Sequence, residues 1–429
     1  MQTNFSLAQL SDPDVAASEQ ILRRCVHCGF CTATCPTFKL LGDELDSPRG
    51  RIYLIKDMLE NDRAADALTV RHIDRCLSCL SCMTTCPSGV NYMHLVDHAR
   101  AHIEQTFTRP LPERWLRRWL AFVLPRPALF RAALLGAMAA KPLARFLPGR
   151  LGAMAGMAPR RLPSPSPVDR PQTFPAEGER RMRVALLTGC AQTVLDPAIN
   201  EATVRLLTRF GAEVVVAEGA GCCGALVHHM GQAEAGKRAA AANVRAWLAA
   251  RPDRIVVNAS GCGTQVKDYG YMLRNDPALA ENAAWISART RDLAEVLDEL
   301  GFGARARGTA PKLRVAYHSA CSMQHGQQIT DLPVRLLEAA GFAPLAVPEG
   351  HICCGSAGTY NLLQPELAGR LGARKAAHIE STRPDAVAAG NIGCMVQITG
   401  ATALPVLHTA QLLDWATGGP KPEGLPEAS

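Results

Sequence analysis

Eight of the sixteen cysteines occur in two copies of one spacing. The first copy contains Cys25, Cys28, Cys31 and Cys35 before Pro36, and the second contains Cys76, Cys79, Cys82 and Cys86 before Pro87. This C-x2-C-x2-C-x3-C-P pattern is typical of proteins that hold a pair of [4Fe-4S] clusters. Zinc sites use separated CxxC pairs, and disulfide frameworks follow other spacings, so both fit the pattern less well. The sequence predicts an electron carrier with two iron-sulfur clusters.

The spacing also predicts which cysteines share a cluster. A cubane cluster binds four soft thiolates, and in runs of this kind the fourth cysteine, beside the proline, ligates the other cluster. We therefore expect one cluster on Cys25, Cys28, Cys31 and Cys86, and the other on Cys76, Cys79, Cys82 and Cys35. This crossing would hold the two clusters close together, as an electron relay requires.

A second set of eight cysteines forms an internal repeat. Equivalent members lie 131 or 132 positions apart: Cys190, Cys222, Cys223 and Cys262, then Cys321, Cys353, Cys354 and Cys394. Each follows a predicted strand, at the end of a parallel sheet where ligands bind. Gly224 and Gly355 are expected to permit close approach of a bulky inorganic group. The matched spacing favours a metal, cluster or redox role over that of small buried apolar residues.

Apolar periodicity divides the chain into segments. Residues 1–110 are predicted to form a mainly helical, ferredoxin-like two-cluster domain, with a helix at 47–60 packed against the clusters. Arg49 and Arg51 on this helix are expected either to pair with acids and clusters or to face solvent.

From residue 182 onward the pattern changes to α/β. Short apolar runs alternate with Ala-rich helical segments, at 183–189, 212–219, 254–261, 314–320, 343–350 and 386–393. This alternation indicates parallel sheets with helical crossovers. We expect a multidomain protein of mixed α+β and α/β class, with repeated α/β domains at 182–305 and 310–429. The Pro- and Ser-rich residues 163–181 are expected to be a linker.

Residues 111–162 are predicted to form a basic, amphipathic helical segment. Ten Arg or Lys residues and a single acid, Glu113, fall within 111–161, so the remainder of this +7 chain is slightly acidic. No run of 18 uncharged apolar residues occurs, which argues against a transmembrane helix. Trp115 and Trp119 share one helical face among arginines, as in a helix on an anionic membrane. We favour the alternative, a helical hairpin that covers its own domain or docks a partner subunit.

Composition narrows the class of protein further. The polar N-terminus has neither the basic nor the apolar region of a signal peptide, and thiolates that bind iron persist in a reducing cytoplasm. Because the excess basic residues are confined to one segment, we expect no nucleic-acid partner. We expect a cytoplasmic protein that lies peripherally on the inner face of the cytoplasmic membrane.

Together, the motifs resemble those of a known family. The C-terminal repeats look like paired CCG domains, the cysteine-rich domains of heterodisulfide reductase B subunits. A two-cluster module followed by two such domains is similar to the iron-sulfur subunit of glycolate oxidase and to the C subunit of anaerobic glycerol-3-phosphate dehydrogenase. The motifs HCGFCTATCPTF, DSPRGRIYLIKDML and CLSCLSCMTTCPSGV most resemble the glycolate oxidase subunits, and only residues 111–181 fall outside the resemblance.

The resemblance implies an electron-transfer subunit of an oxidoreductase complex. A partner flavoprotein would oxidise glycolate to glyoxylate on FAD, and this chain would relay the electrons singly toward a membrane quinone. No G-x-G-x-x-G motif opens a βαβ unit here, so we expect no flavin or nicotinamide site, and no catalytic residue, in this chain. Lactate or glycerol 3-phosphate remains an alternative substrate of the complex.

The sequence departs from the heterodisulfide reductases at one position in each repeat. In those proteins the CCG pattern ends in CxxC and gives five thiolates to a noncubane cluster, whereas Gln265 and Gln397 stand here in place of the fifth cysteine. The remaining thiolates are candidates for a third cluster or zinc. The candidate replacement ligands are His228, His229, His318 and His325, although we expect these to be surface residues. A catalytic disulfide reductase and a zinc-stabilised interaction protein remain alternatives.

Overall fold

The N-terminal part of the chain is built from short helices. The computed structural model describes residues 1–146, 149–306 and 313–425. The first helices are α1 (Leu7–Leu10), α2 (Pro13–Arg24), α3 (Pro36–Leu41), α4 (Pro48–Glu60), α5 (Ala67–Asp74), α6 (Ser81–Thr85) and α7 (Tyr92–Thr106), with turns η1 (Phe30–Thr32) and η2 (Glu44–Asp46). This helical module contains both copies of the CxxCxxCxxxCP pattern.

Helix α4 confirms the helix predicted at 47–60. It begins where the Ser47 hydroxyl accepts a hydrogen bond from the amide of Gly50, with Pro48 in the first turn. Its apolar side is buried in one core with several cysteines of the two runs, among them Cys25, Cys76 and Cys82. The helix therefore packs beside the predicted cluster ligands.

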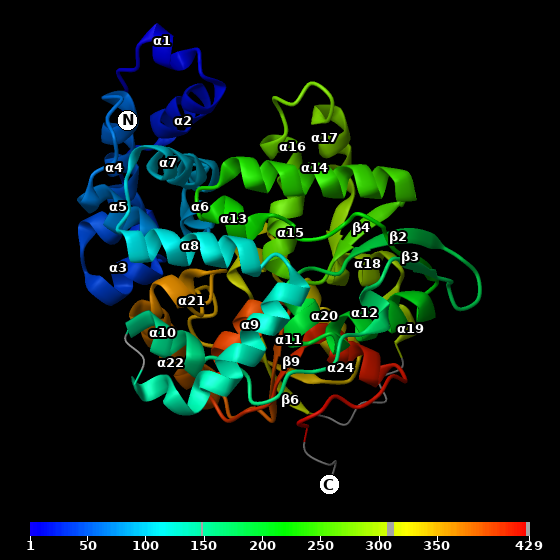
Figure 1. The fold of residues 1–429 in the computed structure, drawn as a ribbon. Coiled ribbons are helices and arrows are strands. Elements are labelled where there is room, and N and C mark those ends of the chain that lie inside the picture. The colour runs from blue at the N-terminus through cyan, green and yellow to red at the C-terminus, as the bar shows by residue number, and fades with distance from the viewer. Residues whose placement is uncertain (147–148, 307–312, 426–429) are drawn as a thin grey trace.

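The described part of the chain after residue 171 contains two sheets (Figure 1). The first has the order β1-β3-β2-β4-β5: β1 (Gln172–Phe174), β2 (Met182–Leu187), β3 (Ala212–Val216), β4 (Arg254–Val257) and β5 (Thr290–Asp292). The second has the order β7-β6-β8-β9: β6 (Arg314–His318), β7 (Ala343–Ala346), β8 (Ala386–Ala389) and β9 (Val406–His408). All neighbours are parallel except β1, which runs antiparallel to β3. The mixed α/β fold class is confirmed.

The two sheets repeat one register, as expected for an internal duplication. Val184 of β2 pairs with Val214 and Arg254, and Val315 of β6, 131 positions later, pairs with the equivalent strands. Strand β8 is buried along its whole length, because helices cover both faces of a parallel sheet.

Helices surround each sheet. Those of the first half are α11 (Gln192–Leu195), α12 (Ala198–Arg209), α13 (Ala225–His229), α14 (Ala233–Ala250), α15 (Ser260–Lys267), α16 (Tyr269–Met272), α17 (Ala280–Arg289), α18 (Leu293–Glu299) and α19 (Phe302–Arg305). Those of the second are η5 (Ser322–Gly326), α20 (Leu332–Ala339), α21 (Tyr360–Leu363), α22 (Pro365–Ser381), α23 (Ile392–Thr399) and α24 (Thr409–Ala416). The halves share an apolar core, and Arg205 and Arg209 of α12 pair with Asp414 of α24.

A further helical layer comprises α8 (Leu111–Val123), α9 (Pro127–Ala140), η3 (Lys141–Phe146) and α10 (Gly149–Gly156). Leu120 of α8 and Leu124 pack against Leu363, so α8 covers its own protein, while Trp115 and Trp119 are exposed on another side. In Figure 1 this layer crosses the front of the molecule beside α21. No helix among the described residues is both long and apolar enough to cross a bilayer.

The segment expected to be a linker, 163–181, contributes η4 (Pro167–Asp169) and the edge strand β1. The predicted domain limit at 305 lies just before residues 307–312, and the predicted limit at 310 lies within them. These residues, like 426–429 at the end of the second predicted α/β domain, lie outside the described residues.

Candidate metal centres and the cavity between them

The structure brings the first predicted set of cluster ligands together. Cys25, Cys28, Cys31 and Cys86 line one small cavity, which Cys82 also borders. Cys28 is exposed, so this set lies at the surface of the module. Cys86 of the second run is thus beside the first three cysteines of the first run, which is the crossed arrangement that the spacing predicts.

The second set lies deeper. Burial raises the pKa of the Cys79 thiol well above its ordinary value, and the neighbouring Cys321, Cys35 and Cys76 raise it further. Cys35, from the first run, therefore lies among the cysteines of the second. No two of the sixteen cysteines are joined by a disulfide, so all sixteen are available as ligands.

The two cysteine runs have matching backbones. His27 and Ser78 each lie two positions after the first cysteine of their run, and their φ values are 55° and 48°. Gly29 and Leu80 each lie four positions after that cysteine, and their φ values are 85° and 61°. Left-handed conformations are costly for residues other than glycine and concentrate at functional sites. Both loops therefore use the same backbone turns to place three sulfurs around one point.

A buried ion-pair network lies beside the second set. Arg51 of α4 is buried and donates from Nε to the His72 carbonyl at 2.7 Å and from Nη2 to the Asp46 carboxylate at 3.3 Å. Its Nη1 lies 3.9 Å from the Cys35 sulfur. The network places a fixed positive charge next to the thiols, whereas Arg49 pairs with Glu44 nearer the surface.

The first CCG half contains a chain of four thiols after strands β2, β3 and β4. Hydrogen bonds from Cys190 and Cys223 lower the pKa of Cys222 well below its ordinary value. Cys262 hydrogen-bonds to Cys223. The same hydrogen bonds, together with burial, raise the pKa values of Cys190 and Cys223 well above the ordinary value. Four sulfurs, each within hydrogen-bonding reach of the next, are donors of the kind that a metal or redox centre uses.

The second CCG half has a different donor set. The Cys321 and Cys353 sulfurs lie 3.7 Å apart. A ring nitrogen of His318 and the sulfurs of Cys354 and Cys394 all lie within 4.8 Å of one another. Burial lowers the pKa of His318 to about 3, with a smaller effect of Lys375, so the imidazole is neutral.

Other positions singled out in the CCG repeats act in packing. Gln265 donates to the Met272 sulfur, and Gln397 donates to the Ala368 carbonyl, so neither amide replaces the missing fifth thiolate. Gly224 and Gly355 have φ values of 83° and 92°. A Cβ on either glycine would meet helix backbone at 3.0 or 2.7 Å. Helices α14 and α22 thus fill the space on the Cβ side of these glycines. The Gly224 and Gly355 amides donate to the sulfurs of Cys222 and Cys353, and close approach of an inorganic group to this backbone stays a prediction.

The expectation of surface histidines is wrong for two of the four candidates, since His318 and His325 are buried. His325 joins the iron-sulfur module to the second CCG half, with Nδ1 2.8 Å from the Thr84 hydroxyl and Nε2 3.1 Å from the His351 carbonyl. Sequence patterns gave no sign of this contact, because it joins residues 241 positions apart.

His228 and His229 of α13 bind Asp97 of α7 and so join the module to the first CCG half. Although burial opposes its ionisation, His229 and His228 hold the pKa of Asp97 well below its ordinary value. Burial likewise opposes a charge on His228, but Asp97 raises its pKa above the ordinary 6.5. The pair therefore stabilises the fold most at a pH that lies between the lowered pKa of Asp97 and the raised pKa of His228.

This linkage predicts a pH-dependent variant. As the pH rises through the raised pKa of His228, the imidazole loses its proton and the ion pair no longer contributes to the stability of the wild type. Protonation of Asp97 removes the same contribution only at acidic pH. Asp97→Asn should therefore lower the thermal unfolding midpoint more at about pH 6 than at an alkaline pH above the raised pKa of His228, where the imidazole is neutral. The exposed Asp298→Asn is the control and should give no such difference; an equal effect of Asp97→Asn at both pH values would contradict the assignment.

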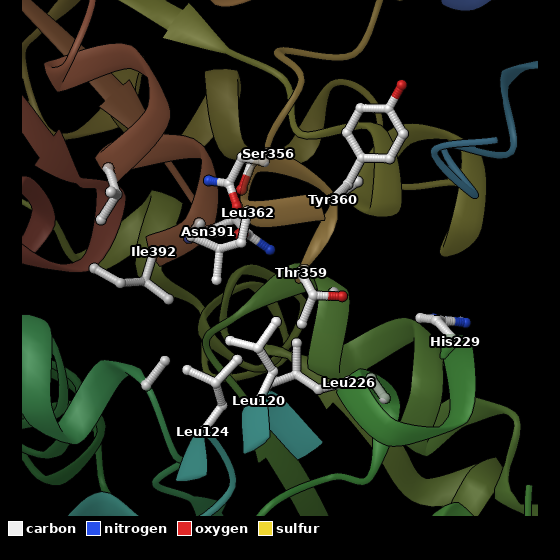
Figure 2. A pocket seen from close by; sticks show the side chains of 18 of the residues that line it. Leu120, Leu124, Leu226, His229, Ser356, Thr359, Tyr360, Leu362, Asn391 and Ile392 are labelled. Atoms are coloured by element: carbon white, nitrogen blue, oxygen red, sulfur yellow. Dashed lines mark hydrogen bonds between the residues drawn. The ribbon is translucent and has the colours of Figure 1, made fainter. Parts of the chain in front are cut away.

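Three of the four thiol sets, all but the surface set that contains Cys28, contribute to the lining of one cavity of about 380 Å³. Its lining includes Cys76 of the iron-sulfur module and cysteines of both CCG halves: Cys190, Cys223, Cys262, Cys321, Cys353, Cys354 and Cys394. The other side is apolar and comes largely from the layer α8–α10. Figure 2 shows Leu120, Leu124, Leu226 and Ile392 around this space, with Asn391, Ser356 and Thr359 supplying polar groups and His229 at one side.

Comparison with protein families finds both kinds of domain. Residues 21–90 match the 4Fe-4S dicluster domain. Residues 184–267 and 315–399 each match the cysteine-rich domain CCG.

Whole-chain relatives are also found. The chain is 43% identical over 419 residues to the glycolate oxidase iron-sulfur subunit of Escherichia coli K12, covering 97% of this chain and 99% of that protein. It is 32% identical to the probable glycolate oxidase iron-sulfur subunit of Bacillus subtilis 168, over 88% of both chains. Lactate utilization protein A of Geobacillus kaustophilus HTA426 is 29% identical over 54% of this chain and 99% of its own length.

A solved structure shares the fold. A hypothetical protein from Helicobacter pylori superposes with a TM-score of 0.54 at 9% identity, over 96% of this chain and 73% of that one.

Proposed function

Since the chain belongs to the family of glycolate oxidase iron-sulfur subunits, we propose that it carries electrons from glycolate, oxidised on an FAD-containing partner subunit, to a quinone. The chain is an iron-sulfur electron-transfer subunit of an oxidoreductase. Iron-sulfur clusters supply the one-electron redox chemistry that amino-acid side chains lack. In this proposal the eight cysteines of the two N-terminal runs hold two [4Fe-4S] clusters in the crossed arrangement, and the CCG cysteines are further metal or redox ligands.

The order of the thiol groups supports a direction for electron flow. The set that contains Cys28 lies at the surface, where a flavoprotein partner has access. The set that contains Cys79 is buried and packs in one apolar cluster with Cys353 of the second CCG half. Electrons that enter at the surface set therefore pass inward, toward the cavity that the CCG cysteines line.

The proposal that the acceptor is a quinone rests on the cavity. Its volume of about 380 Å³ lies within the range of small-molecule sites. One side presents thiols and the other presents leucines and small residues of α8–α10. A metal centre needs only the thiol side, whereas a quinone ring with an apolar tail matches both.

The reaction balances with groups that the complex supplies. Glycolate oxidation to glyoxylate releases two electrons and two protons, and reduction of a quinone to a quinol consumes the same number. His229 lies at the cavity with its Nδ1 3.0 Å from the Asp97 carboxylate, and it offers an ionisable group for moving a proton.

The test is electron paramagnetic resonance of the anaerobically isolated native complex. Glycolate should produce signals of reduced [4Fe-4S] clusters, and a short-chain quinone added next should remove them. Signals that appear with dithionite but not with glycolate would contradict glycolate as the donor. Lactate is the second donor to add, because lactate utilization protein A matches more than half of the chain.

Filling the cavity should separate the two half-reactions. Leu226 lies at the apolar side of the cavity (Figure 2), and Leu226→Trp should lower quinone reduction about tenfold or more, the effect of roughly 1.4 kcal/mol of lost binding. Glycolate should still reduce the clusters. Leu68→Trp, at an exposed position on α5, is the control. Unchanged quinone reduction in Leu226→Trp would place the acceptor elsewhere.

We also propose that the complex lies on the inner, cytoplasmic face of the membrane through helix α8. Trp115 is 67% exposed, and Trp119 and Phe122 continue its side of the helix toward the C-terminus. Aromatic residues beside arginines suit the boundary between headgroups and acyl chains. The same layer lines the cavity, so a quinone from the membrane has a short path.

Charges on this aromatic face should weaken membrane binding. The double variant Trp115→Glu with Trp119→Glu should bind anionic vesicles on the order of tenfold to a hundredfold more weakly, because two large apolar side chains lose their burial. Leu7→Glu with Leu68→Glu changes two exposed leucines on the N-terminal module and is the matched control. Equal flotation of both double variants with vesicles would contradict the membrane contact.

A further inference from the structure

His318 is the unusual residue of the second CCG half. It ends strand β6, is 2% exposed, and neither of its ring nitrogens has a hydrogen-bond partner. The other buried histidines of this half are satisfied at both nitrogens: His325 by Thr84 and His351, and His408 by the Asn258 carbonyl and the Ala410 amide. An unpaired buried polar group costs about 1–3 kcal/mol, so His318 needs a partner of another kind.

The neighbours of His318 are metal ligands. Its ring nitrogen and the sulfurs of Cys354 and Cys394 lie within 4.8 Å of one another, and all three residues are buried. Two thiolates on one tetrahedral zinc ion, each bonded at about 2.3 Å, lie about 3.8 Å apart. The spacing therefore suits a single ion. A cubane cluster binds each thiolate at a different iron atom and spreads its ligands more widely.

The first CCG half lacks this donor set. The position 131 residues before His318 is Leu187, which ends strand β2. In the second half, Lys375 Nζ donates to the Glu349 carbonyl at 2.9 Å. The equivalent residue of the first half is Asn243, whose side-chain amide donates to the Cys222 carbonyl. A neutral nitrogen ligand and a buried cation near the thiols are thus present in one half only.

We propose that the second CCG half binds one zinc ion through His318, Cys354 and Cys394, and that the first half does not. The inference extends the metal-binding role proposed above for the CCG cysteines. One imidazole and two thiolates form a zinc donor set that leaves the fourth tetrahedral position open. Cys354 and Cys394 line the cavity and His318 does not, so that position faces the cavity.

The test is metal analysis of the anaerobically purified native complex, with X-ray absorption at the zinc edge. We expect one zinc per chain, with both sulfur and imidazole nitrogen in its coordination shell. His318→Leu, which copies Leu187 of the first half, should remove most of the zinc, because it deletes one of the three protein ligands, and should leave the iron content unchanged. His325→Leu removes another buried histidine of the same half and should retain zinc.

Three outcomes would overturn the inference: no zinc in the wild type, an all-sulfur zinc shell, or unchanged zinc in His318→Leu. If His318→Leu does not accumulate as folded protein, the coordination shell of the wild type decides alone. Neither measurement uses glycolate or quinone. Failure of glycolate to reduce the clusters would therefore reject the proposed donor and leave the zinc site standing.

Discussion

Cys28→Ser is expected to abolish glycolate-dependent quinone reduction. Cys28 is one of the four predicted ligands of one cluster, which all line the surface cavity of the N-terminal module. A serine hydroxyl is a harder and less readily ionised ligand than a thiolate. The variant should lose the iron of one cluster and its signal in electron paramagnetic resonance. Because this set is the exposed one, the remaining cluster would be cut off from the partner flavoprotein.

Matched variants sharpen this test. Val26→Ser introduces the same hydroxyl at an exposed position of the same loop and should keep both clusters. Under the crossed arrangement, Cys86→Ser should remove the same cluster as Cys28→Ser, and Cys35→Ser should remove the other. Full activity of Cys28→Ser, or loss of different signals in Cys28→Ser and Cys86→Ser, would show that the ligand assignment is wrong.

The strands that the sequence predicts correctly are those whose residues form a recognisable local pattern. The six predicted strands correspond to β2, β3, β4, β6, β7 and β8, because each of them contains a short, continuous apolar run. Strands β1, β5 and β9 have three residues each, and runs this short cannot be distinguished from loops by their sequence pattern. The cysteines after each long strand follow from the same pattern.

The contacts between segments are not visible in the sequence. The cavity takes its lining from the iron-sulfur module, from α8–α10 and from both CCG halves, which no periodicity relates to one another. His318 and Arg51 are polar residues that base rates place at the surface, yet both are buried. Helix α8 illustrates a further limit: its amphipathic pattern predicts one buried face, and Trp115, although apolar, lies on the exposed side.

Asp46→Asn is expected to destabilise the N-terminal module by about 3–5 kcal/mol, the cost of leaving a buried charge without its partner. The Asp46 carboxylate is fully buried and accepts from Arg51 at 3.3 Å and Arg75 at 2.7 Å, with His72 Nδ1 3.0 Å away. An asparagine keeps the shape of the side chain and removes its charge. Arg51 would then remain buried beside Cys35 without its counter-ion.

The measurement is anaerobic urea unfolding of the clustered protein, followed by the visible absorbance of the clusters and by far-ultraviolet circular dichroism. The variant should unfold at lower urea, and cluster absorbance should be lost together with the helices, because the network joins α4, α5 and the loop that carries Cys35. Asp62→Asn removes an exposed carboxylate of the same module and should unfold with the wild type. If both variants share the wild-type midpoint, the ion pair is not what holds α4 beside the cysteines, and apolar packing of Ile55 and Met58 alone accounts for its position.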